Sequence, residues 1–200
     1  VKDLEVDPAE YIDYGHVYQT RFQVLTKAFE NAWKKGVLYS NEFLAFLKEN
    51  GEWLNPYCAF MVLKNSEGGK AYTEWPEDKR VYSFKKCQKV LSDYKEQSLF
   101  FAFLQFKASQ QYGKLREYAR SKGILIVGDI PIYVAADSAD VWANPTEFLL
   151  GEDLKPSWVA GVPPDYFSAT GQLWGNPIYD YKSMEKDGFT WWKKRIKANA

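Results

Sequence analysis

The stretch from Gly123 to Tyr181 constrains the fold of this 200-residue chain more than any other part of it. Counted on to Trp192, it holds six of the nine prolines and five of the eight tryptophans. Proline fixes φ and glycine permits positive φ, so a segment rich in both forms loops of defined shape. Because a sugar ring has an apolar face and a rim of hydroxyls, loops that display aromatic rings beside carboxylates and amides suit a sugar. The sequence therefore predicts carbohydrate contact in this stretch.

A short apolar run at the start of the stretch predicts a buried strand. Ile124–Val127 lies between two glycines and has the length and composition of a strand covered on both faces in a parallel sheet. A helical pattern runs from about Gln97 to Ala119, and Gly123 is its expected end. A helix that leads directly into a buried strand is typical of an α/β fold, which is the fold class that we expect.

The rest of the chain predicts helices and one irregular connection. Apolar side chains recur every three or four residues from Val17 to Lys35, which indicates an amphipathic helix that ends at Gly36. Ala71–Tyr82 has no sustained period and predicts an irregular connection on the surface. Further helices are expected from Ser40 to Gly51, from Asn55 and Pro56 to Gly68, from Ser83 to about Tyr94, and over Phe189–Lys197.

These patterns divide the chain into a helical part, residues 1–110, and a helix–strand–helix part, residues 111–200. The second part carries the loop-rich segment at about 130–181. The chain starts without an initiator methionine or the features of a secretory signal, and its last helical pattern stops without a glycine or proline. We therefore expect an internal piece of a longer protein. No apolar run approaches the length of a membrane span, so no membrane partner is expected.

The composition argues against several classes of partner and site. The 26 basic and 26 acidic residues balance and no basic stripe stands out, so nucleic acid is not an expected partner and the ligand is expected to be neutral. Cys58 and Cys87 lack metal-ligand spacing and are expected to be buried free thiols, which indicates the cytoplasm. His16, the single histidine, is expected to be exposed and provides no Ser–His–Asp arrangement. No glycine-rich phosphate loop occurs.

Asp129 is the first candidate site residue. It follows the apolar run, and α/β barrels place substrate-contacting groups at the carboxyl ends of their strands. An aspartate at this position can instead cap the following turn, and this alternative stays open. The segment Asp137–Asp140 lacks the alternating oxygen ligands and the central glycine of a calcium loop, so a helix-start cap is favoured over a metal site there.

A second group of candidates lies in the glycine- and proline-rich loops that follow. Asp165 comes after two prolines and before Tyr166 and Phe167, so the backbone is stiffened where a carboxylate and two rings are presented. Contact with a sugar is the favoured interpretation, and the alternative is a turn held by Asp165 with both rings in a local core. Trp174, which follows Gln172, is the best candidate for stacking on a sugar. The remaining tryptophans of the stretch are expected to be core or loop anchors: Trp142, Trp158, Trp191 and Trp192.

These residues support contact with a sugar better than they support catalysis. Glycoside chemistry normally needs two carboxyl groups that flank the bond to be broken. Asp129 and Asp165 are available for those roles, but nothing in the sequence sets the distance between them.

Two long runs, Gly128–Pro145 and Val159–Pro177, resemble the 4-α-glucanotransferase family, also known as amylomaltases or disproportionating enzymes. The helical half is similar more loosely, at Trp53, Trp75–Glu77 and Gln105–Phe106. The resemblance implies a (β/α)₈ TIM barrel interrupted by subdomains, of which this chain is a fragment. It also implies the transfer of α-1,4-glucan segments between maltooligosaccharides through a covalent glycosyl-enzyme, with retention and with no metal or organic cofactor.

On this resemblance, residues 1–110 correspond to a helical insertion, Ile124–Val127 to one barrel strand, and the loops at about 130–181 to an irregular subdomain that covers the active site. The family's nucleophile is an Asp in an Arg-x-Asp-His motif, its acid/base is a later Glu, and a third Asp follows a His. None of these motifs occurs in this sequence, so we expect no catalytic residue here and no activity of the isolated chain. The residues that match substrate contacts are Asp129, Asp165, Tyr166, Phe167, Gln172 and Trp174.

Two other functions are weighed against this one. A stand-alone, non-catalytic α-glucan-binding module is the main alternative. A purely helical interaction module is disfavoured, because the aromatic, proline-shaped segment would then have no role.

Overall fold

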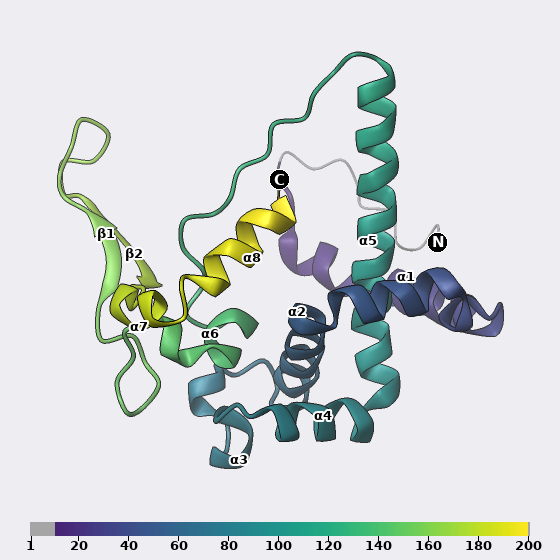
Figure 1. Ribbon diagram of the computed structural model, residues 1–200, viewed down its shortest axis with the longest axis horizontal. Coiled ribbons are helices and arrows are strands. Elements are labelled where there is room, and N and C mark those ends of the chain that lie inside the picture. Colours follow the sequence, from purple (N-terminus) through teal and green to yellow (C-terminus); the bar gives the residue numbers. More distant parts are fainter. Residues whose placement is uncertain (1–10, 200) are drawn as a thin grey trace.

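The computed structural model describes residues 11–199, which form mainly helices (Figure 1). Within these residues no helix is both long and apolar enough to cross a membrane. In chain order the elements are α1 (Tyr14–Lys34), η2 (Val37–Tyr39), α2 (Asn41–Ser66), η3 (Tyr72–Glu74), α3 (Glu77–Arg80), α4 (Phe84–Asp93), α5 (Lys95–Ser121), α6 (Ala139–Ala143), η4 (Pro145–Glu147), β1 (Val159–Val162), β2 (Gln172–Pro177), α7 (Tyr181–Lys186) and α8 (Thr190–Asn199).

Several predicted helix ends are confirmed. Ser40 precedes α2 and Ser83 precedes α4, and each side-chain oxygen accepts a hydrogen bond from the backbone N–H three residues later. At the C-terminal ends of α1 and α5, Gly36 and Gly123 have φ of +74° and +72°. Side chains disfavour this left-handed backbone, so glycine is the residue that allows the chain to turn away there.

Helix α2 continues through Gly51 and Pro56, so the prediction of two separate helices is wrong. Leu54 and Cys58, on either side of the proline, are 1% and 3% exposed and share a buried cluster with Phe101 of α5. Proline lacks the N–H that would donate within the helix, which costs stability. Packing on both sides of Pro56 offsets that loss, because most of the stability of a helix in a protein comes from its buried face.

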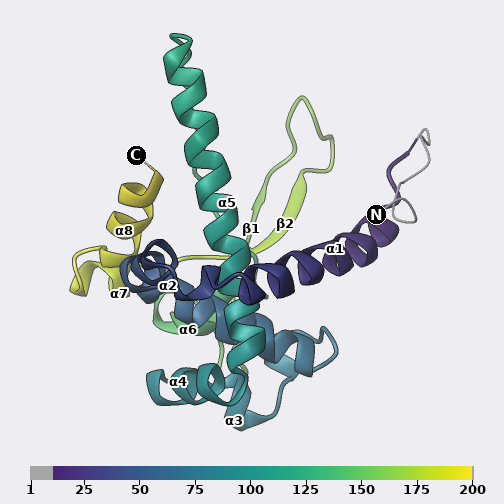
Figure 2. The ribbon, with the colours of Figure 1, turned by 90° about the vertical axis from the view of Figure 1, so that its right-hand side faces the viewer.

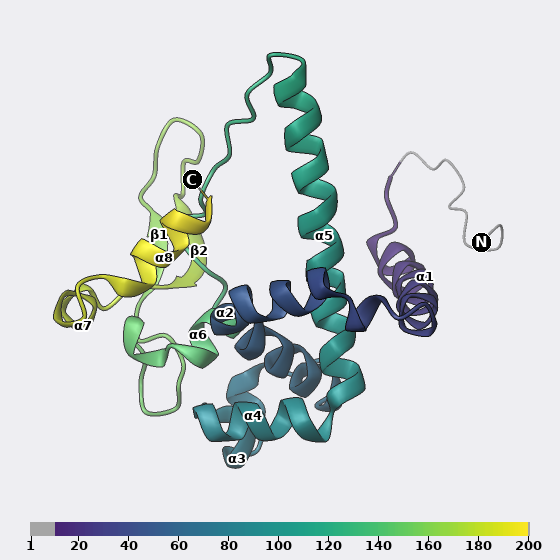
Figure 3. The same ribbon diagram turned by 45° about the vertical axis from the view of Figure 1, so that its right-hand side comes forward.

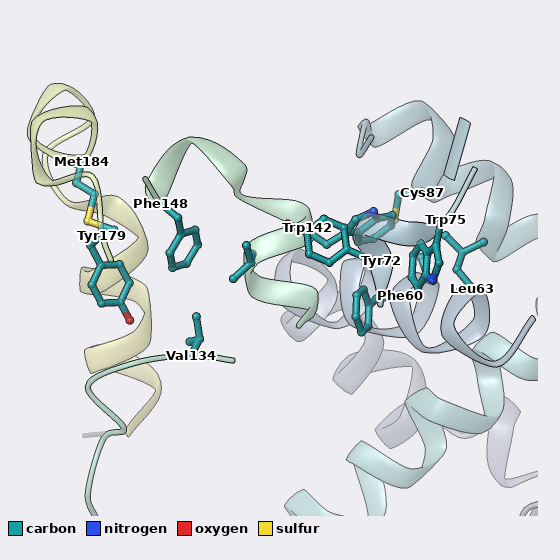
Figure 4. Packing of buried hydrophobic residues seen from close by; sticks show 12 residues of the cluster. Phe60, Leu63, Tyr72, Trp75, Cys87, Val134, Trp142, Phe148, Tyr179 and Met184 are labelled. Atoms are coloured by element: carbon teal, nitrogen blue, oxygen red, sulfur yellow. The ribbon is translucent and has the colours of Figure 1, made fainter. Parts of the chain in front are cut away.

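Two buried clusters hold the helices together. One lies between α1, α2 and α5 and is rich in phenylalanine, with the ring centroids of Phe29 and Phe103 5.6 Å apart. The other joins α2 and α4 to α6, α7 and the segment before α7, as Figure 4 shows for Phe60, Trp142 and Tyr179. Residues from both sides of position 110 share this second cluster, so the C-terminal loops are packed on the helical half. The boundary at 110 stays a prediction.

The connection over Ala71–Tyr82 carries two core residues, so the prediction of a surface connection is wrong. Tyr72 and Trp75 are each 2% exposed. The Tyr72 hydroxyl donates a hydrogen bond to the carbonyl of Leu154, and the Trp75 indole N–H donates to the carbonyl of Lys70, both at 3.0 Å. Because the polar atom of each ring has a partner, the rings can be buried without leaving an unpaired polar atom.

The run Ile124–Val127 forms no strand, which contradicts the prediction of a buried one. Leu125 and Val127 are 79% and 92% exposed. The C-terminal half of α5 rises alone from the other helices, and this run starts the return to them (Figures 1 and 3). A strand can be buried in a parallel sheet only where neighbouring strands pair with its backbone. Within residues 11–199 the sheet consists of the two strands β1 and β2. The described residues therefore form no barrel sheet by themselves.

Strands β1 and β2 form an antiparallel hairpin that extends from the helices on the same side as the C-terminal half of α5 (Figure 2). Gly161 pairs with Leu173 and Val162 with Gln172, and the register shifts between residues 159 and 161. A Cβ atom at Gly161 would lie 2.6 Å from the carbonyl oxygen of Gln172. The two strands can approach this closely only because Gly161 has no side chain.

Candidate functional site

The tip of the hairpin is a turn built around Asp165. Its Oδ1 accepts hydrogen bonds from the backbone N–H groups of Phe167 (2.9 Å) and Ser168 (2.8 Å). The backbone N–H of Asp165 donates to the carbonyl of Ser168 at 2.9 Å, and the Ser168 hydroxyl donates to the carbonyl of Gly171 at 2.7 Å. An aspartate that accepts from the N–H groups two and three residues later is the usual organiser of a tight turn.

This turn holds Tyr166 and Phe167 out in solvent. Their side chains are 97% and 88% exposed, and the two rings meet edge to face with centroids 5.5 Å apart. The turn that was considered as an alternative role for Asp165 is therefore present, but the local aromatic core that went with it is not. Two neighbouring rings held in water on an ordered turn form an apolar surface on which a sugar face can stack.

Trp174 lies on β2, the strand that follows this turn. Its indole N–H donates to Oε1 of Gln172 at 3.0 Å, which sets the orientation of both side chains. The Trp174 ring meets the ring of Tyr133 edge to face at 6.1 Å and remains 48% exposed. The structure therefore brings Gln172 and Trp174 together and leaves about half of the indole open to a ligand.

Tyr133 was not predicted as part of the site, yet it joins Trp174 to the segment that follows Asp129. It stacks on Tyr179, with ring planes 10° apart and centroids at 6.0 Å. The sequence signal was available, since Tyr133 is the aromatic residue of the proline-containing run that follows Asp129. Its partner Tyr179, distant in sequence, was not deducible from spacing.

Side chains from β2 and its surroundings anchor residues 131–134 of this segment. The Asn176 amide donates to the carbonyl of Val134, and the Tyr179 hydroxyl donates to the carbonyl of Ile132, both at 2.8 Å. A guanidinium nitrogen of Arg195 donates to the carbonyl of Pro131 at 2.7 Å. Burial, more than any charge nearby, raises the pKa of Tyr179 to about 12, so its hydroxyl stays protonated as a donor.

Asp129 itself is exposed and lies just before the anchored residues, in a segment without regular structure. It does not end a buried strand, which was the reason for expecting it at a substrate-binding face. Neither its role in sugar contact nor its alternative role as a turn cap is decided by this geometry. Asp129 stays a candidate because the anchored segment joins it to the surroundings of Trp174.

Other predicted features have structural roles. Ser138 caps α6, with its hydroxyl accepting from the N–H of Val141 at 3.3 Å, which confirms the helix-start interpretation of this segment. Asp137 forms an ion pair with Lys64 and accepts from the backbone N–H of Tyr72 at 3.0 Å. In the part of the chain that the structure describes, no group of three or more His, Cys, Asp or Glu side chains is placed to hold a metal ion.

The cysteines, the histidine and most of the remaining tryptophans also lie as expected. Cys58 and Cys87 are buried and free, and burial raises the pKa of the Cys58 thiol to about 12, which leaves it unreactive. His16 is exposed. Trp142 is 2% exposed, and Trp191 and Trp192 pack against Tyr179 at 5.5 and 5.2 Å. Trp158 is 72% exposed, so it is not a core residue.

The comparisons with known proteins all point to one family. Residues 1–200 match the family model of 4-alpha-glucanotransferase. The 4-alpha-glucanotransferase of Aquifex aeolicus is 44% identical over 198 residues, which cover 99% of this chain and 40% of that protein. The chloroplastic/amyloplastic 4-alpha-glucanotransferase of Solanum tuberosum is 41% identical over 196 residues, 94% of this chain and 33% of that protein.

A solved structure shows the same likeness in three dimensions. The amylomaltase from Streptococcus agalactiae, determined in complex with acarbose, superposes with a TM-score of 0.87 at 37% identity and covers 98% of this chain and 39% of that one. The chain thus spans about two fifths of the length of this amylomaltase and of the Aquifex relative. Since the family model matches the chain from end to end, the chain belongs to the 4-alpha-glucanotransferase family.

Proposed function

We propose that this chain is the glucan-contacting part of an enzyme that transfers α-1,4-glucan segments between maltooligosaccharide donors and acceptors, by double displacement with retention. The observation that carries the proposal is the ring pair Tyr166–Phe167, held in solvent by the turn at Asp165. Family membership supports it, and the Streptococcus agalactiae amylomaltase was solved with acarbose. For the whole protein we propose a (β/α)₈ barrel of which this chain provides a fragment.

The proposed contacts divide between two kinds of chemistry. Tyr166, Phe167 and Trp174 offer ring faces, which suit the apolar side of a glucose unit. Asp129 and Asp165 offer carboxylate oxygens, which accept hydrogen bonds from hydroxyls. With these, Gln172 completes the set, because its amide orients the indole of Trp174 and has donor hydrogens as well. The catalytic carboxyl groups are not assigned to any residue of this chain.

Titration with maltoheptaose tests the contact proposal. We expect Trp174→Ala to weaken binding about tenfold, the equivalent of one aromatic stacking contact. Trp158→Ala is the matched control, because Trp158 is also an exposed tryptophan beside the hairpin, at 72%, but is not proposed as a contact. Binding that survives Trp174→Ala unchanged would remove the stacking role. Equal losses in both variants would show that exposed indoles bind glucan without a defined site.

A second experiment tests the assignment of catalysis. The 200-residue chain and its parent protein are each incubated with maltotriose, and glucose and longer chains are measured. We expect disproportionation by the parent and none by the chain. Activity of the chain alone would show that its own carboxylates suffice, whereas a parent that binds maltoheptaose without transfer would favour the non-catalytic binding module.

We propose the cytoplasm as the compartment, on the basis of two buried cysteines that remain unpaired, Cys58 and Cys87. The plastid location in the name of the potato relative is said of that protein only. Fractionation of cells that express the parent protein tests this, and recovery in an oxidising compartment would contradict it.

A further inference from the structure

A cleft of about 650 Å³ lies between α2, α4, α6 and α8, and none of the proposed glucan contacts lines it. Its volume falls within the range of small-molecule sites in proteins. No sequence motif marks this cleft, because its lining comes from segments far apart in the chain, from Gly51 to Ala198. The cleft therefore needs an explanation separate from the hairpin.

Aromatic side chains from three helices line this cleft. Trp53 of α2 is 47% exposed, and its indole N–H donates to Oδ1 of Asn50 at 3.0 Å, which fixes the ring. Phe84, the first residue of α4, is 71% exposed. Trp191 of α8 packs edge to face on Phe148 at 6.1 Å. Exposed ring surface that lines a concave site, rather than a convex one, is typical of ligand recognition.

The cleft also carries a buried acceptor without a donor. Oε2 of Glu147 is buried and has no hydrogen-bond partner among the described residues. Burial first, and then the charges of Asp187 and Asp180, raise the pKa of the Glu147 carboxyl. A buried acceptor that lacks a donor costs free energy, and a ligand hydroxyl that donates to it would remove the cost.

The charges of the lining decide which ligands fit. Lys194 forms an ion pair with Glu52, so that cation is balanced within the cleft. Four carboxylates face two cations in all, which disfavours phosphorylated or carboxylated ligands. The charged lining residues are Glu52, Asp140, Glu147, Asp187, Lys194 and Arg195.

From these observations we propose that the cleft is a second saccharide site, which binds a neutral chain of about two or three sugar rings between Trp53 and Phe84, with one hydroxyl donated to Glu147. Exposed rings and one unpaired acceptor together match a ligand with apolar faces and a rim of hydroxyls. This goes beyond the transfer reaction, since binding here needs neither the hairpin nor a catalytic carboxylate.

The test uses maltotriose and the 200-residue chain with Trp174→Ala already in place, which weakens binding at the hairpin. Calorimetry on this background is expected to show the cleft site at unchanged affinity beside a weakened hairpin site, and an added Trp53→Ala or Phe84→Ala is expected to weaken the cleft site about tenfold. Tyr39→Ala is the control, since Tyr39 is 70% exposed, much as Phe84 is, and does not line the cleft. Circular dichroism checks that each variant folds.

The possible outcomes separate this proposal from the function proposed above. If Trp174→Ala leaves no maltotriose site of unchanged affinity, the cleft proposal is overturned and the hairpin site stands. If binding persists on that background but neither Trp53→Ala nor Phe84→Ala weakens it, the cleft is also excluded. A cleft that binds an aliphatic amine but not maltotriose would overturn the assignment of a neutral sugar. If Trp53→Ala or Phe84→Ala weakens maltotriose binding and Trp174→Ala does not, the result supports the cleft site and counts against the hairpin site.

Discussion

Alanine substitutions at three glycines of the hairpin test whether close backbone approach, or positive φ alone, shapes the loop that carries Tyr166 and Phe167. Gly171 has φ of +75°, and a Cβ there would lie 2.6 Å from the carbonyl oxygen of Val162. At Gly175 the φ is +76° but nothing lies within 4 Å of the added atom.

Gly161 is the third position and tests close approach alone. A Cβ there would lie 2.6 Å from the carbonyl oxygen of Gln172, but its φ is not positive. Left-handed backbone costs a residue with a side chain about 1–2 kcal/mol. Forcing an atom into occupied space costs about 1–3 kcal/mol. We therefore expect Gly175→Ala to lose about 1–2 kcal/mol, Gly161→Ala about 1–3 kcal/mol, and Gly171→Ala the sum of both, about 2–5 kcal/mol.

Urea unfolding followed by circular dichroism gives the global free energy of unfolding of each variant. Because a hairpin tip can open without global unfolding, hydrogen exchange at the N–H groups of Asp165, Phe167 and Ser168 is measured as well. Gly171→Ala is expected to speed exchange at all three positions the most. If Gly171→Ala is no more harmful than Gly175→Ala in either assay, steric contact does not determine the turn, and the argument from close approach fails.

Two further predictions concern buried groups near the site. Tyr179→Phe removes the donor to the carbonyl of Ile132 and is expected to lower the free energy of unfolding by about 1–3 kcal/mol; a change below about 0.5 kcal/mol in urea unfolding would show that this bond does not hold the segment. The raised pKa of Glu147 means that the folded state binds this proton more tightly than the unfolded state, so its contribution to stability is lost as pH rises through the folded-state pKa. Glu147→Gln should therefore gain stability relative to the unsubstituted chain as pH rises above about 4, the ordinary range of a glutamate, and a pH-independent difference would contradict the shift.

The parts of the fold that follow from local chemistry were predictable from the sequence. Ser40 and Ser83 cap helices because their hydroxyls reach the third N–H, and Gly36 and Gly123 end helices because they tolerate positive φ. These interactions span only a few residues. Periodicity and residue type therefore carry the information.

The errors arose where distant packing outweighs local preference. Pro56 is a helix breaker by itself, but Leu54 and Cys58 bury the helix on either side of it. Trp75 lies in a segment without a periodic pattern, and its burial depends on Phe60 and Trp142, whose rings are 5.3 and 6.2 Å away. A single sequence gives no signal for such neighbours, since they lie on other elements of the fold.

For the candidate site, the sequence identified the exposed side chains but not their support. Asp165 and Trp174 were found because a loop stiffened by proline and glycine presents a carboxylate and a ring there, and Gln172 because it matches the family's substrate contacts. Tyr133 and Tyr179 escaped notice, because their contribution is a stack and a hydrogen bond to a carbonyl from another segment. Contact with a substrate stays a prediction for all of them.

The exposure of the ring pair favours sugar contact over a purely structural loop. Burial of a side chain such as phenylalanine stabilises a protein by about 1.5–3 kcal/mol, and Tyr166 and Phe167 gain almost none of this at 97% and 88% exposure. At the same time the turn beneath them is ordered by two hydrogen bonds to Asp165, so the rings are not exposed through lack of structure. A loop that served only to connect β1 and β2 would need neither ring. Two rings kept in water on an ordered support are what the proposed glucan contact requires, because a glucan chain has apolar faces that can cover them.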